Sequence, residues 1–266
     1  MISAMAKAVA LTSMRFYMKE IIDTKRVSHL FDGWKETMIL SAMQSVMGSI
    51  YGNEDSAVAA AVDFCFYSGK PNGDLIRFWP PECKRDLRLL VPKDKAWEEN
   101  IEDTLGGSVK KVTRYALQKT SENFDRNHLK TLAAALPKGY TLRHFDKEIY
   151  DQIIADGWGH TLVASYDDYD HFASKGWGVA VMHGDEMAAG ISSYCTFDGG
   201  YEVEINTHLD HRRKGLGLAC AAQFILDCLD RDLYPGWDAA NEGSLRMAQK
   251  LGYLFDREYV AYIQYR

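Results

Sequence analysis

The sequence has few cysteines, and none of them stands in a spacing typical of a metal or redox site. The 266 residues contain five cysteines and no C-x-x-C motif. They are Cys65, Cys83, Cys195, Cys220 and Cys228. An odd number without paired spacing argues against a disulfide framework and against a zinc site. We therefore expect reduced thiols in or near hydrophobic cores, no bound metal and a cytoplasmic location.

Long apolar runs and an excess of positive charge are also missing. Polar residues interrupt every stretch of ~18 residues, the length of a membrane span, so we expect no transmembrane helix and no membrane partner. Residues 1–16 lack the charged start, solid apolar run and clear cleavage site of a signal peptide. The formal net charge of −6 disfavours a nucleic-acid partner and is compatible with a cationic small substrate.

What the chain does have is enough apolar sequence for two ordinary domains. Hydrophobic residues make up 47% of it, which is normal for a globular protein. A boundary is predicted at residues 136–139, Leu-Pro-Lys-Gly, because the helical stretch 127–135 ends there at a proline and a glycine. We therefore predict an N-terminal α/β domain at residues 1–136 and a second domain at residues 137–266.

The N-terminal half shows a mixed pattern of helices and strands. Helical apolar spacing predicts helices at residues 14–24, 38–47 and 97–105. Runs rich in β-branched or aromatic residues predict strands at residues 49–51, 63–67, 87–92 and 109–117. Nothing in this half has the spacing of a known catalytic constellation. Its expected roles are to close a substrate pocket or to build a homodimer.

The C-terminal half has a clearer order of elements. Strands are predicted at residues 140–143, 177–183, 187–194, 201–208, 237–240 and 254–263. Helices are predicted at residues 147–155 after a capping Asp146, 166–174, 216–229 and 242–251. Consecutive hairpins followed by crossover helices predict an α/β (α+β) fold with a mixed sheet covered on both faces.

The most informative segment leads from a strand through a basic glycine loop into a long helix. Gly215 and Gly217 have no Cβ to keep an anion away from the free N–H groups at a helix start. Arg212, Arg213 and Lys214 add positive charge at the same place. The segment therefore predicts a diphosphate site, and the alternative is a basic turn with an ordinary glycine cap.

Two common phosphate motifs do not fit this loop. A Walker pattern is absent, and the third position of a Rossmann fingerprint is occupied by Cys220 instead of glycine. The pattern Arg-x-x-Gly-x-Gly at residues 212–217 instead resembles the acetyl-CoA pyrophosphate loop of the GNAT superfamily of N-acetyltransferases. Downstream, a short strand, Asn241 and a helix ending in Leu-Gly-Tyr at 251–253 follow in the order of that family.

The resemblance narrows further and implies an activity. The extra N-terminal domain and the runs 202–207 and 235–241 are similar to a bacterial subfamily that includes the zwittermicin-resistance acetyltransferases. The resemblance implies that a C-terminal GNAT domain transfers an acetyl group from acetyl-CoA to the amine of a small molecule, with aminopolyol antibiotics among the candidates. Because the N-terminal half has no glycine loop of its own, a single coenzyme A site is expected.

The resemblance also implies which residues bind the cofactor. The strands at 201–208 and 237–240 would receive the pantetheine arm between them, and backbone groups near Asn206 would bind its amides or polarise the thioester. The residues implied to contact coenzyme A are Thr207, Leu209, Arg212, Arg213, Lys214, Gly215, Leu216, Gly217, Leu218, Asn241 and Ser244.

A catalytic base is sought among the acidic residues of the same strand. Glu202 and Glu204 point to one side of it, because strand side chains alternate, and either could take a proton from an alkylammonium substrate. The alternatives are that they lie on a solvated face or bind a cationic substrate without moving a proton. His208 and His160 are lesser candidates.

The general acid of the family is missing. Many members have a tyrosine four residues before the glycine of the Leu-Gly-aromatic motif, and Ala248 stands at that position here. Tyr253 is expected to be a core residue. This departure motivates an alternative, a non-catalytic acyl-CoA-binding or regulatory protein. Aminoacyl transfer from a charged tRNA is a third possibility, which the acidic net charge disfavours.

Overall fold

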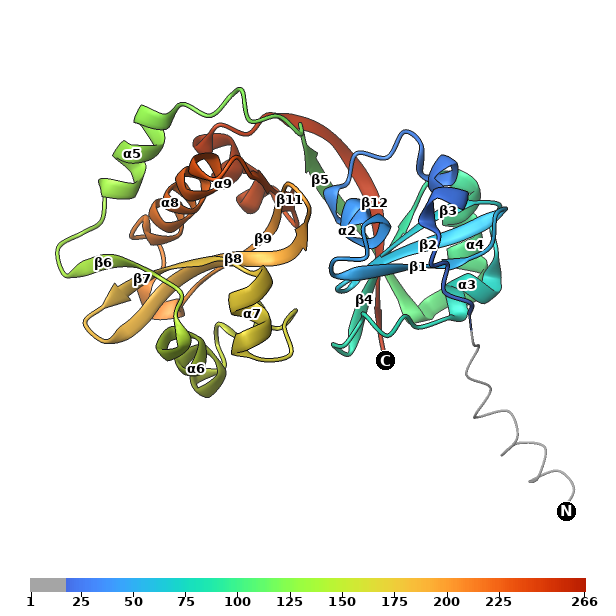
Figure 1. Ribbon diagram of the computed structural model, residues 1–266, viewed down its shortest axis with the longest axis horizontal. Helices are drawn as coiled ribbons and strands as arrows, with labels where there is room; N and C mark the ends of the chain where they lie inside the picture. The colour runs from blue at the N-terminus through green and yellow to red at the C-terminus, as the bar shows by residue number, and fades with distance from the viewer. Residues whose placement is uncertain (1–17) are drawn as a thin grey trace, which may run out of the picture.

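Two β-sheets organise residues 18–266, the part of the chain that the computed structural model describes (Figure 1). The first sheet has the strand order β1-β2-β3-β4-β12-β5-β11, and the second has the order β10-β9-β8-β7-β6. The strands are β1 (Gly48–Gly52), β2 (Ser56–Ala61), β3 (Phe64–Gly69), β4 (Leu87–Pro92), β5 (Val109–Leu117), β6 (Tyr140–His144), β7 (Gly178–His183), β8 (Glu186–Phe197), β9 (Gly200–Thr207), β10 (Tyr234–Gly236), β11 (Asp238–Ala239) and β12 (Phe255–Tyr265).

Helices cover these sheets. The α-helices are α2 (Thr37–Met43), α3 (Gly73–Arg77), α4 (Lys95–Leu105), α5 (Arg126–Ala134), α6 (Lys147–Asp156), α7 (Tyr169–Lys175), α8 (Leu216–Asp230) and α9 (Glu242–Leu251). Short 3₁₀ turns include η4 (His160–Leu162) and η5 (Leu209–His211). None of the helices within residues 18–266 is both long enough and apolar enough to cross a membrane.

The second sheet is buried on both faces, as the predicted fold requires. In β7, Val179 and Val181 pack with α8, whereas Ala180 and Met182 pack with α6 and α7. This alternation follows from the two-residue period of a strand. The sheet is mixed, because β10 runs parallel to β9 while the other neighbours are antiparallel. The predicted mixed sheet with helices on both faces is therefore confirmed.

The first sheet contains one strand, β2, that the sequence does not predict. All six residues of β2 are buried, and four of them are alanines. Ala57 and Ala59 face the core under α2, and Val58 and Ala60 face the core under α3 and α4. Alanine has a low strand propensity, so burial between two layers, and not local preference, makes this segment a strand.

The two halves of the sequence share the first sheet. β12, from the C-terminal half, lies between β4 and β5 and pairs antiparallel with both. β11 extends the same sheet beyond β5, and Figure 1 shows β12 and β5 running together between the two lobes. The chain passes from the first sheet to the second between β5 and β6 and returns between β10 and β11. The division into domains 1–136 and 137–266 stays a prediction.

Capping residues explain where several helices begin, and two predicted helices need correction. Asp146 caps α6, as expected, through the N–H of Ile149 at 3.0 Å. The predicted helix at 166–174 starts later, because Asp168 caps α7. The predicted helix at 14–24 lies partly outside the described residues, and its described part is not α-helical: Glu20 forms a bridge with Tyr51 at the edge of β1.

Candidate functional site

The site begins where the chain after α8 leaves β9 and joins β5, as β10 is followed by β11. β10 pairs with β9 up to Gly236 opposite Glu202, whereas β11 pairs with β5. Trp237 stands between the two short strands and is buried; its Nε1 donates to Ser244 Oγ at 3.0 Å. Beyond Glu202, the outer edge of β9 has no strand partner in the described part of the chain. A slot therefore opens between β9 and β11, where the sequence predicts it.

Backbone groups of β9 alternate between its two edges. The N–H of His208, just after the strand, donates to a carbonyl oxygen of β8 at 2.9 Å. The backbone of Ile205 and Thr207 must then face the slot, since successive residues of a strand bond in opposite directions. The N–H of Val203 faces the same way but belongs to the pairing with β10 that ends at Gly236. Arg212 Nε accordingly reaches the Thr207 carbonyl oxygen at 3.2 Å. Because the Thr207 N–H also donates to Asn206 Oδ1, Ile205 is the residue whose backbone groups face the slot without a partner in the described part of the chain.

The start of α8 lies at one end of this slot. Gly215 is its left-handed N-cap, with φ +80°, and no side chain of residues 18–266 caps the helix. The N–H groups of residues 216–218 have no intrahelical partner. A Cβ on Gly215 would meet nothing within 4 Å, whereas one on Gly217 would lie 3.3 Å from Thr207 Oγ1. Gly215 therefore keeps the helix start open, and Gly217 lets α8 pack closely against β9.

A cavity of about 670 Å³, here named the loop groove, surrounds these N–H groups. Its lining residues are Ile205, Asn206, Thr207, His211, Arg212, Arg213, Gly215, Leu216, Gly217, Leu218, Gly243, Arg246, Met247 and Lys250. Free helix N–H groups beside several cations favour the binding of a phosphate group. The groove thus brings together most of the residues predicted for the cofactor.

Four of the predicted residues lie elsewhere. Lys214 Nζ donates to Tyr140 Oη at 3.1 Å, outside the lining of the loop groove. Leu209 is 70% exposed, also outside the lining. Asn241 is the N-cap of α9 and accepts from the N–H of Ser244 at 3.0 Å. Asn241 and Ser244 line the neighbouring cavity instead.

Sequence reasoning missed the contribution of α9. Gly243, Arg246, Met247 and Lys250 line the loop groove from one side. Their spacing of three, four and seven residues places them on one face of a helix. That spacing was the available signal, because two cations on the face of a helix that follows a phosphate loop can reach the same anion.

A second cavity, the inner pocket, continues from the loop groove. The two cavities share Ile205, Gly243 and Met247. The inner pocket holds about 380 Å³, within the range of roughly 300–1,000 Å³ for small-molecule sites. The N-terminal half of the chain supplies part of its lining, which no local sequence signal indicates: Met38, Phe64, Arg85, Leu89 and Arg114.

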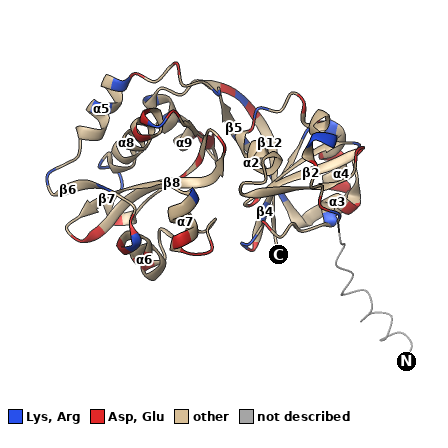
Figure 2. Cartoon of the chain, in the orientation of Figure 1, with Lys and Arg blue, Asp and Glu red and all other residues tan. Residues whose placement is uncertain are grey.

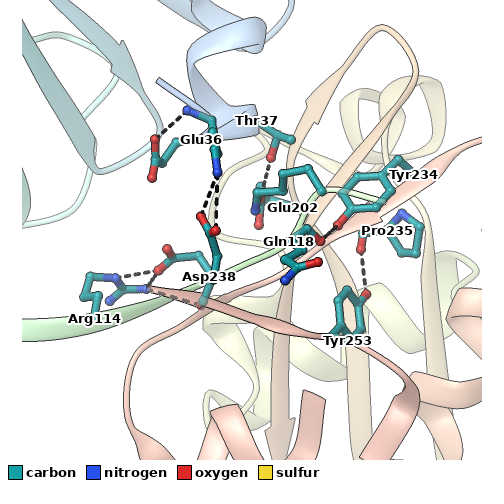
Figure 3. Close-up of polar contacts among 12 residues, drawn as sticks. Glu36, Thr37, Arg114, Gln118, Glu202, Tyr234, Pro235, Asp238 and Tyr253 are labelled. Atoms are coloured by element: carbon teal, nitrogen blue, oxygen red, sulfur yellow. Dashed lines mark hydrogen bonds and ion pairs between the residues drawn. The ribbon is translucent and has the colours of Figure 1, made fainter. Parts of the chain in front are cut away.

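Glu202 lines the inner pocket but is held by neighbouring side chains. It is 3% exposed, and its Oε1 accepts from the hydroxyl of Thr37 and from Lys119 Nζ (Figure 3). Burial raises the pKa of Glu202, and the charge of Lys119 and the hydrogen bond from Thr37 oppose that rise. The carboxylate is therefore occupied by the protein itself.

Glu204 lines the same pocket, so the prediction that both glutamates share one side of the strand is confirmed. Glu204 is only partly buried. Burial raises its pKa above the ordinary value, while a hydrogen bond with Thr161 and the charges of Arg85 and Arg114 act in the opposite direction. A carboxylate whose pKa is raised toward neutrality is a better proton acceptor for an ammonium group.

Other candidates have structural partners. Asn206 Oδ1 accepts from the N–H of Thr207 at 3.2 Å, and its Nδ2 lies 3.4 Å from Thr161 Oγ1. Neither His160 nor His208 lines the inner pocket. Tyr253 is buried and donates to a backbone oxygen at 2.6 Å, which confirms it as a core residue.

The polar contacts beside the pocket also involve an ion pair between the two halves. Arg114 Nε donates to Asp238 Oδ1 at 2.6 Å, and Tyr259 donates to Asp238 Oδ2 at 2.6 Å. Figure 3 shows Arg114 of β5 reaching Asp238 of β11. Because both side chains of this pair are largely buried, it fixes β11 away from β9 and holds the slot open.

Acidic residues gather around α7, away from this site (Figure 2). Asp167, Asp168 and Asp170 are exposed, and Asp168 serves as the helix cap, so these residues form a solvated helix face. No group of three or more His, Cys, Asp or Glu side chains within residues 18–266 could hold a metal ion. All five cysteines are buried free thiols.

Comparison with known proteins identifies the family to which this chain belongs. The family model described as GNAT acetyltransferase matches residues 28–262, which includes both the loop groove and the inner pocket. The chain belongs to the GNAT acetyltransferase family. The resemblance inferred from residues 212–217 is therefore confirmed at the level of the family, and the narrower likeness to zwittermicin-resistance enzymes stays a prediction.

Related proteins share this fold over most of their length. A GCN5-related N-acetyltransferase-like protein from Streptococcus suis 89/1591 has 38% sequence identity and a TM-score of 0.83, covering 92% of this chain and 98% of that chain. The N-acetyltransferase YdfB of Bacillus subtilis (strain 168), itself uncharacterized, is 26% identical over 87% of this chain and 91% of its own. A GCN5-related N-acetyltransferase from Kribbella flavida shares the fold at 15% identity, with a TM-score of 0.53 over 91% of this chain and 95% of its own.

The position where the resemblance to the GNAT superfamily implies a tyrosine carries a buried alanine in this chain. Ala248, at the position where many members carry the general acid, is fully buried against the core that includes Trp237 and Leu251. A larger side chain has no free space there. Any proton needed by a leaving group must therefore come from elsewhere in the site.

Proposed function

We propose that the chain transfers an acetyl group from acetyl-CoA to the amine of a small molecule. The continuity of the loop groove with the inner pocket carries this proposal, because a diphosphate at α8 and an amine beside Glu204 would meet along β9. The pantetheine arm would lie between them, along the part of β9 at residues 205–207 that has no strand partner on this side. Holding both substrates in one groove supplies most of the rate, about 7–11 kcal/mol for well-oriented reactants.

Glu204 is the proposed general base, and Glu202 a structural residue. The ammonium proton of the acceptor passes to Glu204, and the free amine nitrogen bonds to the thioester carbon. The C–S bond then breaks, and the second proton on the amine nitrogen passes to the departing thiolate directly or through water, so the products are a neutral amide and coenzyme A as a thiol. Glu204 returns its proton to solvent. The N–H of Ile205, which faces the slot without a partner, is suited to stabilise the negative charge on the thioester oxygen.

The charges of the inner pocket support an amine as acceptor. Arg114 is paired with Asp238, Lys119 with Glu202 and Arg85 with Asp63. Glu204 is in no ion pair with any residue of the described chain, so an ammonium group would balance it. The likeness to zwittermicin-resistance acetyltransferases makes aminopolyols the first amines to test. Neither a nucleic acid nor a membrane is part of this proposal.

Two further proposals concern the cellular compartment and the oligomeric state. Five buried free thiols suit a reducing compartment, so we place the enzyme in the cytoplasm. The first sheet already completes the inner pocket within one chain, so a homodimer, if formed, is expected to leave the site intact. Sedimentation at assay concentrations, with activity measured per chain, would test this.

The direct test is release of coenzyme A from acetyl-CoA with a panel of amines, followed by mass spectrometry of the products. Turnover with an acetyl group added on nitrogen is expected for at least one aminopolyol or simple alkylamine. Binding of acetyl-CoA at one site per chain with no turnover on any amine would favour the alternative, a non-catalytic acyl-CoA-binding protein. That alternative has one observation in its favour, the buried Ala248.

The cations on α9 provide a separate prediction. Replacing Arg246 and Lys250 together by glutamine is expected to weaken acetyl-CoA binding roughly tenfold, ~1.4 kcal/mol, because both line the loop groove. Titration calorimetry measures the affinity. The matched control is the pair Arg126 and Lys130 on α5, also four residues apart but outside the groove. If both double variants bind acetyl-CoA like the wild type, α9 takes no part in phosphate binding.

A further inference from the structure

The tight turn between β2 and β3 has a strained backbone. Ala61 pairs with Phe64, so Val62 and Asp63 alone connect the strands. Val62 has φ +54°, which is rare for a β-branched residue and costs about 1–3 kcal/mol. The next side chain, Asp63, is 1% exposed and contacts Arg85 and Tyr194, which both line the inner pocket. A strained turn of this kind persists where a side chain must be held in one place.

Asp63 holds Arg85 through one of its two oxygens. Arg85 Nε donates to Asp63 Oδ2 at 2.5 Å, and the hydroxyl of Tyr194 donates to the same oxygen at 2.9 Å. Asp63 Oδ1 is buried and has no hydrogen-bond partner within residues 18–266. A pair serving stability would use both oxygens, because an unsatisfied buried acceptor costs about 1–3 kcal/mol. The arrangement therefore needs an explanation other than stability.

Tyr194 reaches Asp63 because of an irregularity in β8. The register shifts from Ser193 opposite Val203 to Cys195 opposite Glu202, so Tyr194 is an extra residue without a partner on β9. Such a bulge redirects a side chain. Here it directs Tyr194 of the C-terminal half toward Asp63 and Arg85 of the N-terminal half. Two separate backbone irregularities thus converge on one guanidinium group.

We propose that Arg85, held in place by Asp63 and Tyr194, is a positioning residue for the inner pocket: it presents a fixed positive charge to the Glu204 carboxylate across the pocket without forming an ion pair with it. Arg85 comes from the loop before β4, Tyr194 from β8 and Glu204 from β9, and all three line this pocket. The inference rests on the proposed role of Glu204 as the base. It also gives the N-terminal half a part in the chemistry, which the sequence alone did not assign.

The charges around Glu204 make the proposal specific. Arg85 and Arg114 favour its ionised form, as does the hydroxyl of Thr161, whereas Asp63 disfavours it. Removing the two members of the Arg85–Asp63 pair must therefore move the pKa of Glu204 in opposite directions. Loss of packing or of fold would instead move it the same way in both variants. The opposite signs separate an electrostatic role from a structural one.

The test is the titration of the Glu204 side-chain carboxyl carbon by NMR, in protein labelled with carbon-13 at glutamate and assigned with Glu204→Gln. Arg85→Gln is expected to raise the pKa of Glu204 by about one pH unit, and Asp63→Asn to lower it. Arg85→Lys, which keeps the charge, should stay near the wild type. Lys84→Gln, which removes the neighbouring cation of the same loop, is the matched control and should have no effect.

Two outcomes would overturn the inference. Either Arg85→Gln and Asp63→Asn shift the Glu204 titration in the same direction, or neither shifts it while the Lys84 control behaves as expected. Should Asp63→Asn fail to fold, the comparison of Arg85→Gln with Arg85→Lys still decides. Because the titration needs no turnover, it can fail or succeed independently of the proposed acetyl transfer. In an active enzyme, the acid limb of the kcat/KM profile should follow the same shifts.

Discussion

Glu204→Gln is expected to lower kcat by roughly 10²–10⁴-fold, the usual contribution of a general base. In the wild type, kcat/KM should fall as the pH drops through the raised pKa of Glu204, because the protonated carboxyl cannot accept the ammonium proton. The variant should lose that acid limb. The measurement is a pH profile of coenzyme A release with an accepted amine.

Glu202→Gln is the matched control for this variant. It changes the same residue type two positions away, but its carboxylate is already occupied by Thr37 and Lys119. Its kcat should stay within about tenfold of the wild type, a small loss compared with removal of a general base. If the larger loss and the missing acid limb belong to the Glu202 variant instead, the roles of the two glutamates are reversed.

The melting temperature of Glu204→Gln shows whether a loss of activity comes from unfolding. A carboxyl whose pKa is raised by folding stabilises the protein most at pH values below its unfolded pKa, and this stability is lost as the pH rises through the folded pKa. At neutral pH, Glu204 is therefore not a stabilising residue. Glu204→Gln should melt at the same temperature as the wild type or higher, so a loss of activity cannot be attributed to unfolding.

Gly215→Glu is expected to weaken acetyl-CoA binding at least ~100-fold. The new side chain would enter open space at the start of α8, where the free N–H groups point, and place a carboxylate where phosphate is proposed to bind. Each charge-assisted hydrogen bond lost costs about 1.5–3 kcal/mol, and 1.4 kcal/mol is a factor of ten. Calorimetric titration of acetyl-CoA into both proteins measures the effect.

Gly184→Glu controls for backbone strain in that experiment. Gly184 also has a positive φ, +63°, and a Cβ at its position would likewise meet nothing within 4 Å. It lies in the turn between β7 and β8, outside the loop groove. The Gly184 variant should therefore bind acetyl-CoA like the wild type. Equal affinity of the Gly215 variant and the wild type would remove the loop groove as the coenzyme A site.

Local sequence signals were enough for much of the C-terminal half. Asp146 and Asn241 cap the helices that their positions predict, and the basic glycine loop opens α8 as expected. Each of these features depends on a few neighbouring residues and on hydrogen bonds within one turn. The basic glycine loop at the start of α8 was predictable for this reason.

The inner pocket was not predictable, because its parts come from distant segments. Arg85, Arg114 and Tyr194 meet Glu204 only after β12 and β11 join the first sheet. Strand pairing over such separations leaves no periodic pattern in the sequence, and β2 is built from alanines that do not favour strands. The bulge at Tyr194 and the strained Val62 are likewise set by tertiary contacts.

The place of β12 has a consequence for how the protein is made. On the ribosome, β4 and β5 are synthesised long before β12, which must later insert between them. Until it arrives, both strands expose edges with unsatisfied hydrogen-bonding groups. The first sheet therefore cannot close during translation of its own half, and its folding should be slow and dependent on chaperones in the cell.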